Sequence, residues 1–353
     1  MAAFMSLKTQ YENLGDEVIN SILLQEIAKR TQVNALSADV PQWYLQNVRD
    51  NIGLAGANVR YFDDQRAFTT ALLCAGVRPP KSWVFTACGD VSGEQSDYKR
   101  DLSFTLLQYL PWLRLASVGA SYSSVSPSKA RLLRLASQRS KGISVRDSLS
   151  QSLLAEKQVK VDRVPDLAFK MPWRSTGFEP VRALFSFRQI AGRNEATFTA
   201  LLKKAVEELN EVGLPSAMTW QVGRDEEYCR CLAEKIGIPI KAPPDPHARV
   251  KAMCQVYDGA ALVFSNRLHV LLVAASRGAV PIALLHKSER KIRGIFYDNN
   301  MSDYYDEPEN FAFEKLKAII RNLPQYSSKV RSVFDKNSRE IDDYFDRTLG
   351  STL

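Results

Sequence analysis

Hydrophobic positions along the chain alternate between short runs of β-branched or aromatic residues and longer segments with a helical period. The short runs predict strands over residues 83–87, 113–118, 142–145, 183–187, 218–222, 261–264 and 280–284. The amphipathic segments predict helices over residues 17–30, 66–75, 101–110, 128–140, 147–154, 195–211, 225–236, 248–257 and 268–277. Such alternation favours an α/β fold with parallel sheets covered by helices on both faces.

A stretch with two prolines and a glycine, residues 171–180 (MPWRSTGFEP), divides this series and is the expected linker. We expect an α/β domain over 1–172 and a second over 173–310. Residues 311–353 are expected to form a helical segment of one or two charged helices with Pro324 between them. Ligands of doubly wound sheets bind outside the carboxyl ends of the strands. The sequence therefore predicts two Rossmann-like doubly wound domains that face each other across a cleft.

The amino-acid composition indicates a globular protein but does not identify its ligand. The chain has 353 residues, of which 45% are hydrophobic and 24% are charged, as in globular proteins. Its net charge of +8 favours anionic partners, such as nucleic acid, lipid headgroups or phosphorylated metabolites. Nucleic acid is not expected, because no nucleic-acid-binding motif accompanies the charge. Much of the excess charge is expected on solvated helix faces, at Lys129, Arg131, Arg134, Arg139, Lys287, Arg290, Lys291 and Arg293.

The cysteines and the apolar runs indicate a cytoplasmic protein. Five cysteines, an odd number without paired zinc-ligand spacing, indicate reduced thiols and no metal site. No secretory signal is expected at the N-terminus. The longest apolar stretch, residues 270–275, is far shorter than the roughly 20 residues of a membrane helix, so membrane association would be peripheral. P-loop, G-x-G-x-x-G and G-x-S-x-G motifs are missing, which excludes the common nucleotide and acyl-transfer classes.

Asn13 to Glu17 (NLGDE) ends a polar loop and opens a helix. Asp16 and Glu17 suit the positive end of a helix dipole and could only stabilise the helix start. Alternatively, the Gly15 backbone lies close to a ligand and Asp16 points towards it. The motif alone leaves both interpretations open.

Two further motifs place cations where strands run into helices. Arg146 follows the predicted strand 142–145, where its guanidinium could bind a carboxylate or phosphate, or pair structurally with Asp147 or Asp166. Arg267 and His269 lie between the predicted strand 261–264 and the helix after it, a position that suits an anion site. A structural role for His269, one of three histidines, is the alternative.

In this order, the motifs resemble those of the polysaccharide pyruvyl transferase family. The resemblance covers about residues 11–300. It comprises N-x-G-D-E (13–17), S-V-R-D-x-x-S (144–150), V-P-D-x-A-F (164–169), R-L-H (267–269), G-x-x-P-I-x-L (278–284) and Lys291-Ile292. The resemblance implies a two-domain fold similar to that of GT-B glycosyltransferases. One departure is the short apolar run at residues 2–7, which suggests a stunted first strand.

The resemblance implies transfer of the enolpyruvyl carbons of phosphoenolpyruvate onto two hydroxyls of a sugar, with release of phosphate. The acceptor would belong to a cell-surface glycan or exopolysaccharide, as polymer, repeat unit or lipid-linked precursor, and neither cofactor nor metal is implied. Asp16 and His269 would be the catalytic acid and base, in either order. The substrate-binding positions implied by the resemblance are Asn13, Gly15, Arg146, Arg267 and Lys291.

Two alternatives use the same architecture. The first is a GT-B glycosyltransferase that uses a nucleotide sugar; retaining members usually carry two glutamates eight residues apart, and a partner for Glu289 would fall on Tyr297. The second is a non-catalytic glycan-binding component of a polysaccharide assembly system. Stabilisation by phosphoenolpyruvate, by a sugar nucleotide or by glycan alone distinguishes these possibilities.

Overall fold

The chain forms two compact units in a computed structural model. Unit 1 comprises Met1–Tyr11, Asp16–Leu167 and Ser338–Leu353, and unit 2 comprises Glu12–Gly15 and Ala168–Asn337. The structure describes residues 1–87, 90–91, 106–107, 109–140, 142–174, 181–243 and 249–350. Most of the expected helix at 101–110 and linker residues 175–180 lie outside these ranges.

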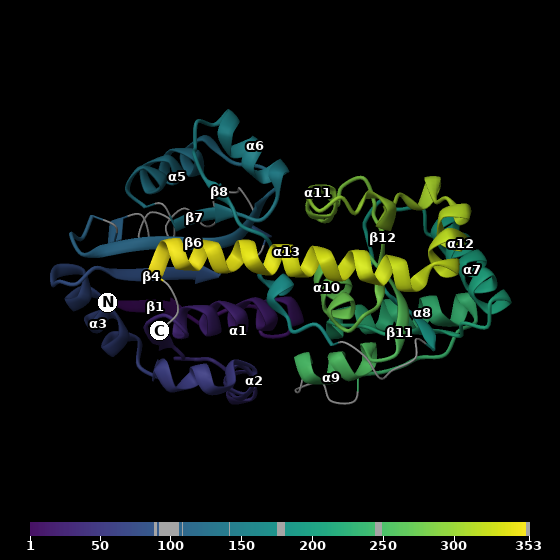
Figure 1. The fold of residues 1–353 in the computed structure, drawn as a ribbon, viewed down its shortest axis with the longest axis horizontal. Coiled ribbons are helices and arrows are strands. Elements are labelled where there is room, and N and C mark those ends of the chain that lie inside the picture. Colours follow the sequence, from purple (N-terminus) through teal and green to yellow (C-terminus); the bar gives the residue numbers. More distant parts are fainter. Residues whose placement is uncertain are drawn as a thin grey trace. The chain divides into compact units, whose positions relative to one another are not determined.

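Unit 1 is built on a parallel sheet with the strand order β3-β2-β1-β4-β6-β7-β8. Figure 1 labels β1, β4, β6, β7 and β8 of this sheet. The strands are β1 (Ala2–Ser6), β2 (Gln32–Leu36), β3 (Val59–Phe62), β4 (Ser82–Ala87), β6 (Leu113–Tyr122), β7 (Gly142–Val145) and β8 (Asp162–Arg163), and the short β5 (Asp90–Val91) pairs with β6. The expectation of a stunted first strand is wrong: β1 has five residues, as many as β2, and it pairs with both β2 and β4 at the centre of the sheet. The order runs outwards from this centre in both directions, which defines a doubly wound sheet.

The helices of unit 1 connect these strands by crossovers. They are α1 (Leu14–Ala28), α2 (Gln42–Ile52), α3 (Gln65–Val77), α5 (Pro127–Arg139) and α6 (Ser148–Glu156). Right-handed crossovers put helices on opposite faces where the strand order reverses. Side-chain caps fix several helix starts: Asp64 accepts from the Ala67 N–H at 2.6 Å, and Ser126 accepts from Lys129 just ahead of Pro127.

Unit 2 contains the sheet β10-β9-β11-β12-β13, also parallel. Its strands are β9 (Arg182–Ser186), β10 (Ser216–Met218), β11 (Ala260–Ser265), β12 (Val280–Leu284) and β13 (Tyr305–Asp306). Its helices are α7 (Glu195–Glu211), α8 (Glu226–Ile236), α9 (Arg249–Tyr257), α10 (Leu268–Ser276), α11 (Arg290–Asp298) and α12 (Phe313–Arg321). Every residue of β11 and β12 is buried, which explains their uninterrupted apolar sequences.

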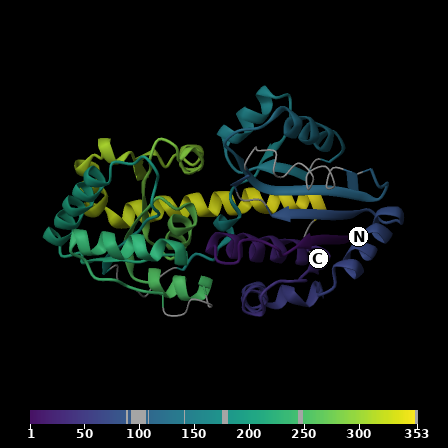
Figure 2. The ribbon, with the colours of Figure 1, turned by 180° about the vertical axis from the view of Figure 1, so that it is seen from behind.

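The long helix α13 (Leu323–Leu349) supplies residues to both units. In unit 2 the Phe334 ring packs 5.0 Å from Phe169. In unit 1 the Tyr344 hydroxyl donates to the Gly142 carbonyl at 2.7 Å, and the Phe345 ring lies 6.3 Å from Phe85. Figure 2 shows this last part of α13, in yellow, running along the strands of unit 1.

The observed division differs from the expected domains at the C-terminal end. Residues 311–337 belong to unit 2 and residues 338–353 to unit 1, so they form no separate segment. The two expected charged helices are present as α12 and α13, but Pro324 is the second residue of α13 and does not lie between them. Proline is well tolerated in a first helical turn, where its missing N–H would have no helical partner.

Each of the seven expected strands corresponds to an observed one, and the largest difference is at residues 218–222. There β10 ends at Met218, and the chain continues to a 3₁₀ turn at Gly223–Asp225. The expectation of solvated charge is wrong for Lys129, which is only 5% exposed on α5. No helix in the described part of the chain is long and apolar enough to cross a membrane.

Candidate active site

The start of α1 is fixed by the side chain of Asn13. Its Oδ1 accepts a hydrogen bond from the Gly15 N–H at 3.1 Å, the geometry of an N-cap. The neighbouring Glu12 carbonyl accepts from the Arg249 guanidinium of α9. Residues 12–15 are thereby attached to unit 2, although they lie near the N-terminus.

Gly15 leaves room for the imidazole of His269. A Cβ added to Gly15 would lie 2.7 Å from both Cγ and Cε1 of the His269 ring, and closer still to Nδ1. Because Gly15 has ordinary helical backbone in α1, a left-handed conformation does not explain the glycine. The close approach expected at Gly15 is therefore to a side chain of the protein itself.

Asp16 is held by the loop that follows β1. Its Oδ2 accepts from the Thr9 hydroxyl at 2.7 Å and from the Gln10 N–H at 3.3 Å. The carboxylate is half-buried in the first turn of α1. Hydrogen bonds to this carboxylate oxygen fix the orientation of the Asp16 side chain.

Arg146 lies in a buried polar network and is only 4% exposed. Its Nε donates to Ser121 Oγ at 2.7 Å, and its Nη1 donates to Asp166 Oδ2 at 2.6 Å. Ser121 Oγ in turn donates to Asp147, which caps α6 by accepting from the Ser150 N–H at 2.7 Å. The Arg146–Asp166 ion pair considered from the sequence is therefore present.

Arg267 is held by Asp225, a residue that the motifs did not indicate. The Arg267 Nε and Nη2 groups bind the two oxygens of Asp225 in a fork, with 2.6 Å between Nη2 and Oδ1. Asp225 is 5% exposed and comes from the turn after β10. Burial raises the pKa of the nearby Cys229 thiol to about 12, so this thiol stays neutral beside the pair.

A second arginine lies at the same edge of the sheet in unit 2. The Asn266 side chain accepts from the Arg188 N–H at 2.9 Å and donates to the Arg188 carbonyl at 3.0 Å. The Arg188 guanidinium pairs with the buried carboxylate of Glu289 at 3.0 Å. Because Ser265 pairs with Ser186 in the β11–β9 register, Arg267 and Arg188 leave neighbouring strands two residues further on. The sequence signal for Arg188 was its position directly after a predicted strand.

Lys291 lies in the first turn of α11, which follows β12. β12 is the neighbour of β11 in the sheet, so Lys291, Arg267 and His269 all follow carboxyl ends of adjacent strands. His286, in the β12–α11 loop, contacts Ser288 Oγ through Nδ1 at 2.9 Å. His247 lies outside the described residues.

The structure thus brings part of the expected site together. Gly15, Arg267 and His269 meet in unit 2, and Lys291 lies in the first turn of α11, which follows the neighbouring strand β12. Within unit 1, however, Asp16 follows β1 whereas Arg146 follows β7, and β4 and β6 lie between. At about 4.8 Å per strand, these two strand ends are roughly 14 Å apart.

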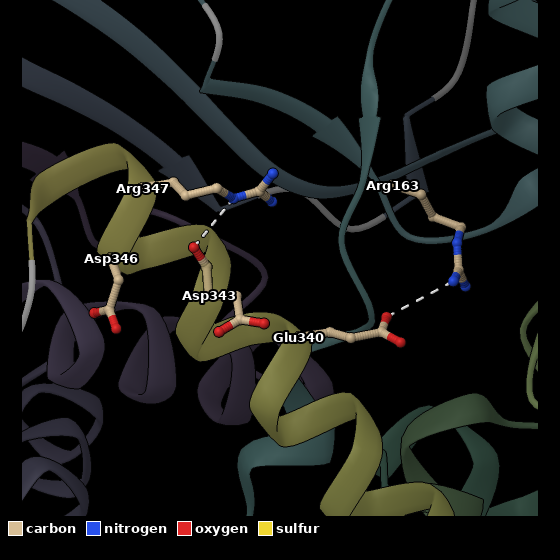
Figure 3. A pocket seen from close by; sticks show the side chains of 5 residues that line it. All are labelled: Arg163, Glu340, Asp343, Asp346 and Arg347. Atoms are coloured by element: carbon tan, nitrogen blue, oxygen red, sulfur yellow. Dashed lines mark hydrogen bonds and ion pairs between the residues drawn. The ribbon is translucent and has the colours of Figure 1, made fainter.

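A cavity of unit 1 lies away from these motifs. It has a volume of about 640 Å³ and is lined by Arg163, Glu340, Asp343, Asp346 and Arg347 (Figure 3). Arg163 and Glu340 point towards each other across it, with 3.7 Å between Nη2 and Oε2. None of these residues belongs to the motifs above, and the cavity is not part of the candidate site.

Solved structures define the class of fold. HepE from Anabaena in complex with UDP-glucose is similar with a TM-score of 0.57 and 10% identity, over 99% of this chain and 98% of that chain. The UDP-GlcNAc 2-epimerase from Neisseria meningitidis bound to UDP-GlcNAc has a TM-score of 0.54 and 10% identity, over 98% of each chain. S. aureus MnaA with UDP has a TM-score of 0.54 and 10% identity, over 98% of this chain and 95% of that chain. The fold is GT-B-like, with two Rossmann-like α/β domains.

The sequence defines the family within this class. Polysaccharide pyruvyl transferase matches residues 13–289, which is most of the chain, and the protein belongs to that family. Among curated proteins, none matches the sequence significantly. The family match covers the N-x-G-D-E, S-V-R-D and R-L-H motifs but ends just before Lys291.

Proposed function

We propose that this protein transfers the pyruvyl unit of phosphoenolpyruvate onto two hydroxyls of a sugar, forming a cyclic ketal and releasing phosphate. The observation that carries the proposal is the packing of Gly15 against the His269 ring. Two motifs far apart in the sequence thereby meet at the edge of one sheet, where α/β proteins bind their ligands.

The reaction sets the roles of the residues. Protonation of the methylene carbon of phosphoenolpyruvate creates an oxocarbenium-like centre, which a sugar hydroxyl attacks with loss of its proton to a base. Phosphate then leaves with the bond electrons, and the second hydroxyl closes the ring and loses its proton. We assign the supply of a proton to one of Asp16 and His269 and its acceptance to the other, in either order.

The cations would offset the charge of the carboxylate and phosphate groups. Arg267 gives Nε and Nη2 to Asp225, so Nη1 is the nitrogen that we assign to the anion. Arg146 gives Nε and Nη1 to its own network, so Nη2 is the corresponding group there. Buried acidic partners fix both guanidinium planes before a ligand binds, which lowers the entropy cost of binding. We assign Lys291 to the same anion.

The direct test follows phosphate release in the His269→Ala variant. We expect wild-type protein, given phosphoenolpyruvate and a panel of sugar acceptors, to release phosphate with one of them. The variant should lose this activity and keep its melting temperature, because His269 is half-buried at a helix start. Arg163→Ala, in the cavity outside the site, is the matched control. Full phosphate release by the His269 variant would exclude the assignment.

A nucleotide-sugar glycosyltransferase is the second candidate, because HepE carries UDP-glucose on a similar fold. A ligand that binds the folded state raises the melting temperature. Under the pyruvyl transferase proposal, phosphoenolpyruvate stabilises the protein and UDP-glucose does not. The reverse result would favour the glycosyltransferase, and stabilisation by glycan alone would favour a binding component. We further propose that the reaction takes place in the cytoplasm, and at the inner face of the membrane if the acceptor is lipid-linked.

A further inference from the structure

A half-exposed aromatic and charged surface lies beside Asp16 in unit 1. It is formed by Lys8, Tyr11, Asp39 and Trp43 and is here called the β1–β2 surface. β1 and β2 are neighbours in parallel register, with Ser6 opposite Leu36, so the loops after them leave the sheet side by side. This edge is where α/β sheets bind ligands. Helices α1 and α2 continue from the two loops (Figure 1).

The aromatic part of this surface rests on Tyr44. The Tyr44 side chain is fully buried, and its ring centroid lies 5.1 Å from that of Tyr11 and 5.8 Å from that of Trp43, both edge-on. Tyr11 and Trp43 are only half-buried, so each ring keeps an accessible part. The buried Tyr44 ring thus holds the accessible rings of Tyr11 and Trp43 in place.

The polar part of the surface is an exposed ion pair. Lys8 Nζ lies 2.9 Å from Asp39 Oδ2, with side chains 41% and 84% exposed. The Asp39 backbone is left-handed, with a φ of 61°, and its carbonyl accepts from the Tyr11 hydroxyl. Because an exposed pair of this kind contributes little to stability, its charges remain available for hydrogen bonds to a ligand.

The same elements hold the proposed catalytic carboxylate. The Tyr44 hydroxyl donates to the Asp16 carbonyl at 3.4 Å, and Thr9, between Lys8 and Tyr11, donates to the Asp16 carboxylate at 2.7 Å. A ligand on the β1–β2 surface would therefore lie close to the group that takes or gives a proton.

We propose that the β1–β2 surface binds the pyranose ring of the acceptor sugar. Tyr11 and Trp43 pack against the apolar C–H face of the ring, because the negative face of an aromatic ring attracts C–H groups. Lys8 and Asp39 hydrogen-bond ring hydroxyls through charged groups. The sugar then presents a hydroxyl to Asp16. This inference rests on the proposed function and names the place of its second substrate.

The kinetic test uses the Trp43→Leu, Tyr11→Leu and Asp39→Ala variants. Each should raise the KM for the acceptor about tenfold or more, with the KM for phosphoenolpyruvate within twofold of wild type. Tyr109→Leu is the control, since Tyr109 is 49% exposed in unit 1 and lies before β6, away from the carboxyl ends. Thermal melts identify any variant that fails to fold. An unchanged acceptor KM in all three folded variants would overturn the proposal.

A binding test separates this proposal from the proposed function. Methyl glycosides of glucose, galactose and N-acetylglucosamine are titrated without phosphoenolpyruvate and followed by ligand-detected NMR. Binding by wild type that is lost in Trp43→Leu and kept in Tyr109→Leu supports the β1–β2 surface, even if no phosphate is ever released. Equal binding by all three proteins would overturn the assignment of the β1–β2 surface. So would the absence of binding by a wild type that releases phosphate when one of these glycosides is the acceptor. Either result leaves the proposed pyruvyl transfer intact.

Discussion

The missing side chain of Gly15 leaves space for the His269 ring in the candidate site. A glycine at a helix start near the carboxyl ends of a sheet's strands, where ligands bind, usually indicates close approach of the ligand to the backbone. Here the His269 imidazole occupies the space that a Cβ at this position would need. A glycine is therefore needed at this position so that the His269 ring can keep its observed orientation.

Replacing Gly15 by alanine should separate activity from stability. Alanine is the better helix former by about 1 kcal/mol, so the helix start tolerates it. The imidazole must move, however, and a displacement of about 1 Å at a reacting group can cost 10²-fold in rate. We expect phosphate release to fall at least tenfold in Gly15→Ala while the melting temperature stays within a few degrees of wild type.

Gly56→Ala is the matched control for this experiment. A Cβ at Gly56 would meet only the Ile52 side chain, at the ordinary contact distance of 3.4 Å. Activity retained in Gly15→Ala would mean that the position of the His269 ring is not needed.

At the scale of elements, the site of unit 2 depends on contacts between loops. The fork from Arg267 to Asp225 joins the loop after β11 to the turn after β10. Both side chains are largely buried, with exposures of 11% and 7%. A charge left there without its partner would be costly, because removing one member of a buried pair costs about 3–5 kcal/mol.

The Asp225→Asn variant tests this pair. The amide removes the negative charge and replaces one acceptor by a donor, so we expect the free energy of unfolding in urea to fall by about 2–4 kcal/mol. Glu226→Gln is the neighbouring control, since Glu226 pairs with Arg230 on the surface at 2.8 Å, and its change should stay below about 1 kcal/mol. Equal effects of the two substitutions would contradict a structural role for the fork.

The sequence predicted the elements best where the hydrophobic pattern was that of a fully buried strand or of an amphipathic helix. The bounds of β12 and α7 agree with the prediction: β12 is buried at every position, and α7 is amphipathic with Asn194 as its cap. β3 was missed because its Arg60 is exposed and Val59 and Tyr61 are only half-buried on an edge strand. Residues 219–222 were predicted as the end of a strand, but they lie outside the sheet. They connect β10 to the turn that contains Asp225, the partner of Arg267.

The candidate site was predictable only in part, because local motifs identify single residues but not the partners that folding brings to them. Motif positions indicated Arg146, Arg267 and His269 from local spacing. Their partners Asp166, Asp225 and Gly15 come from other parts of the chain, and only folding decides which acid meets which arginine. For Arg146, the structure selected Asp166 over its sequence neighbour Asp147, which caps α6 instead.

At the scale of the whole molecule, net charge is the property that bears on partners. With +8 and an isoelectric point near 9.1, the chain is attracted to anionic surfaces. We expect it to co-sediment with vesicles containing 30% phosphatidylglycerol at low salt and to be released at 0.5 M NaCl, since screening shortens electrostatic reach. Phosphatidylcholine vesicles are the control. Binding that is equal on both vesicles, or unaffected by salt, would contradict an electrostatic association.

The path of α13 has a consequence for synthesis on the ribosome. Unit 1 starts the chain, yet its sheet receives Tyr344 and Phe345 only after all of unit 2 has been translated. At about 5–20 residues per second, residues Ala168–Asn337 take roughly 10–30 s to synthesise. During this interval the sheet around Phe85 lacks the cover that α13 provides, whereas unit 2 is nearly continuous in sequence. The unit that emerges first is therefore the last to complete its core, and until then its uncovered apolar surface favours aggregation.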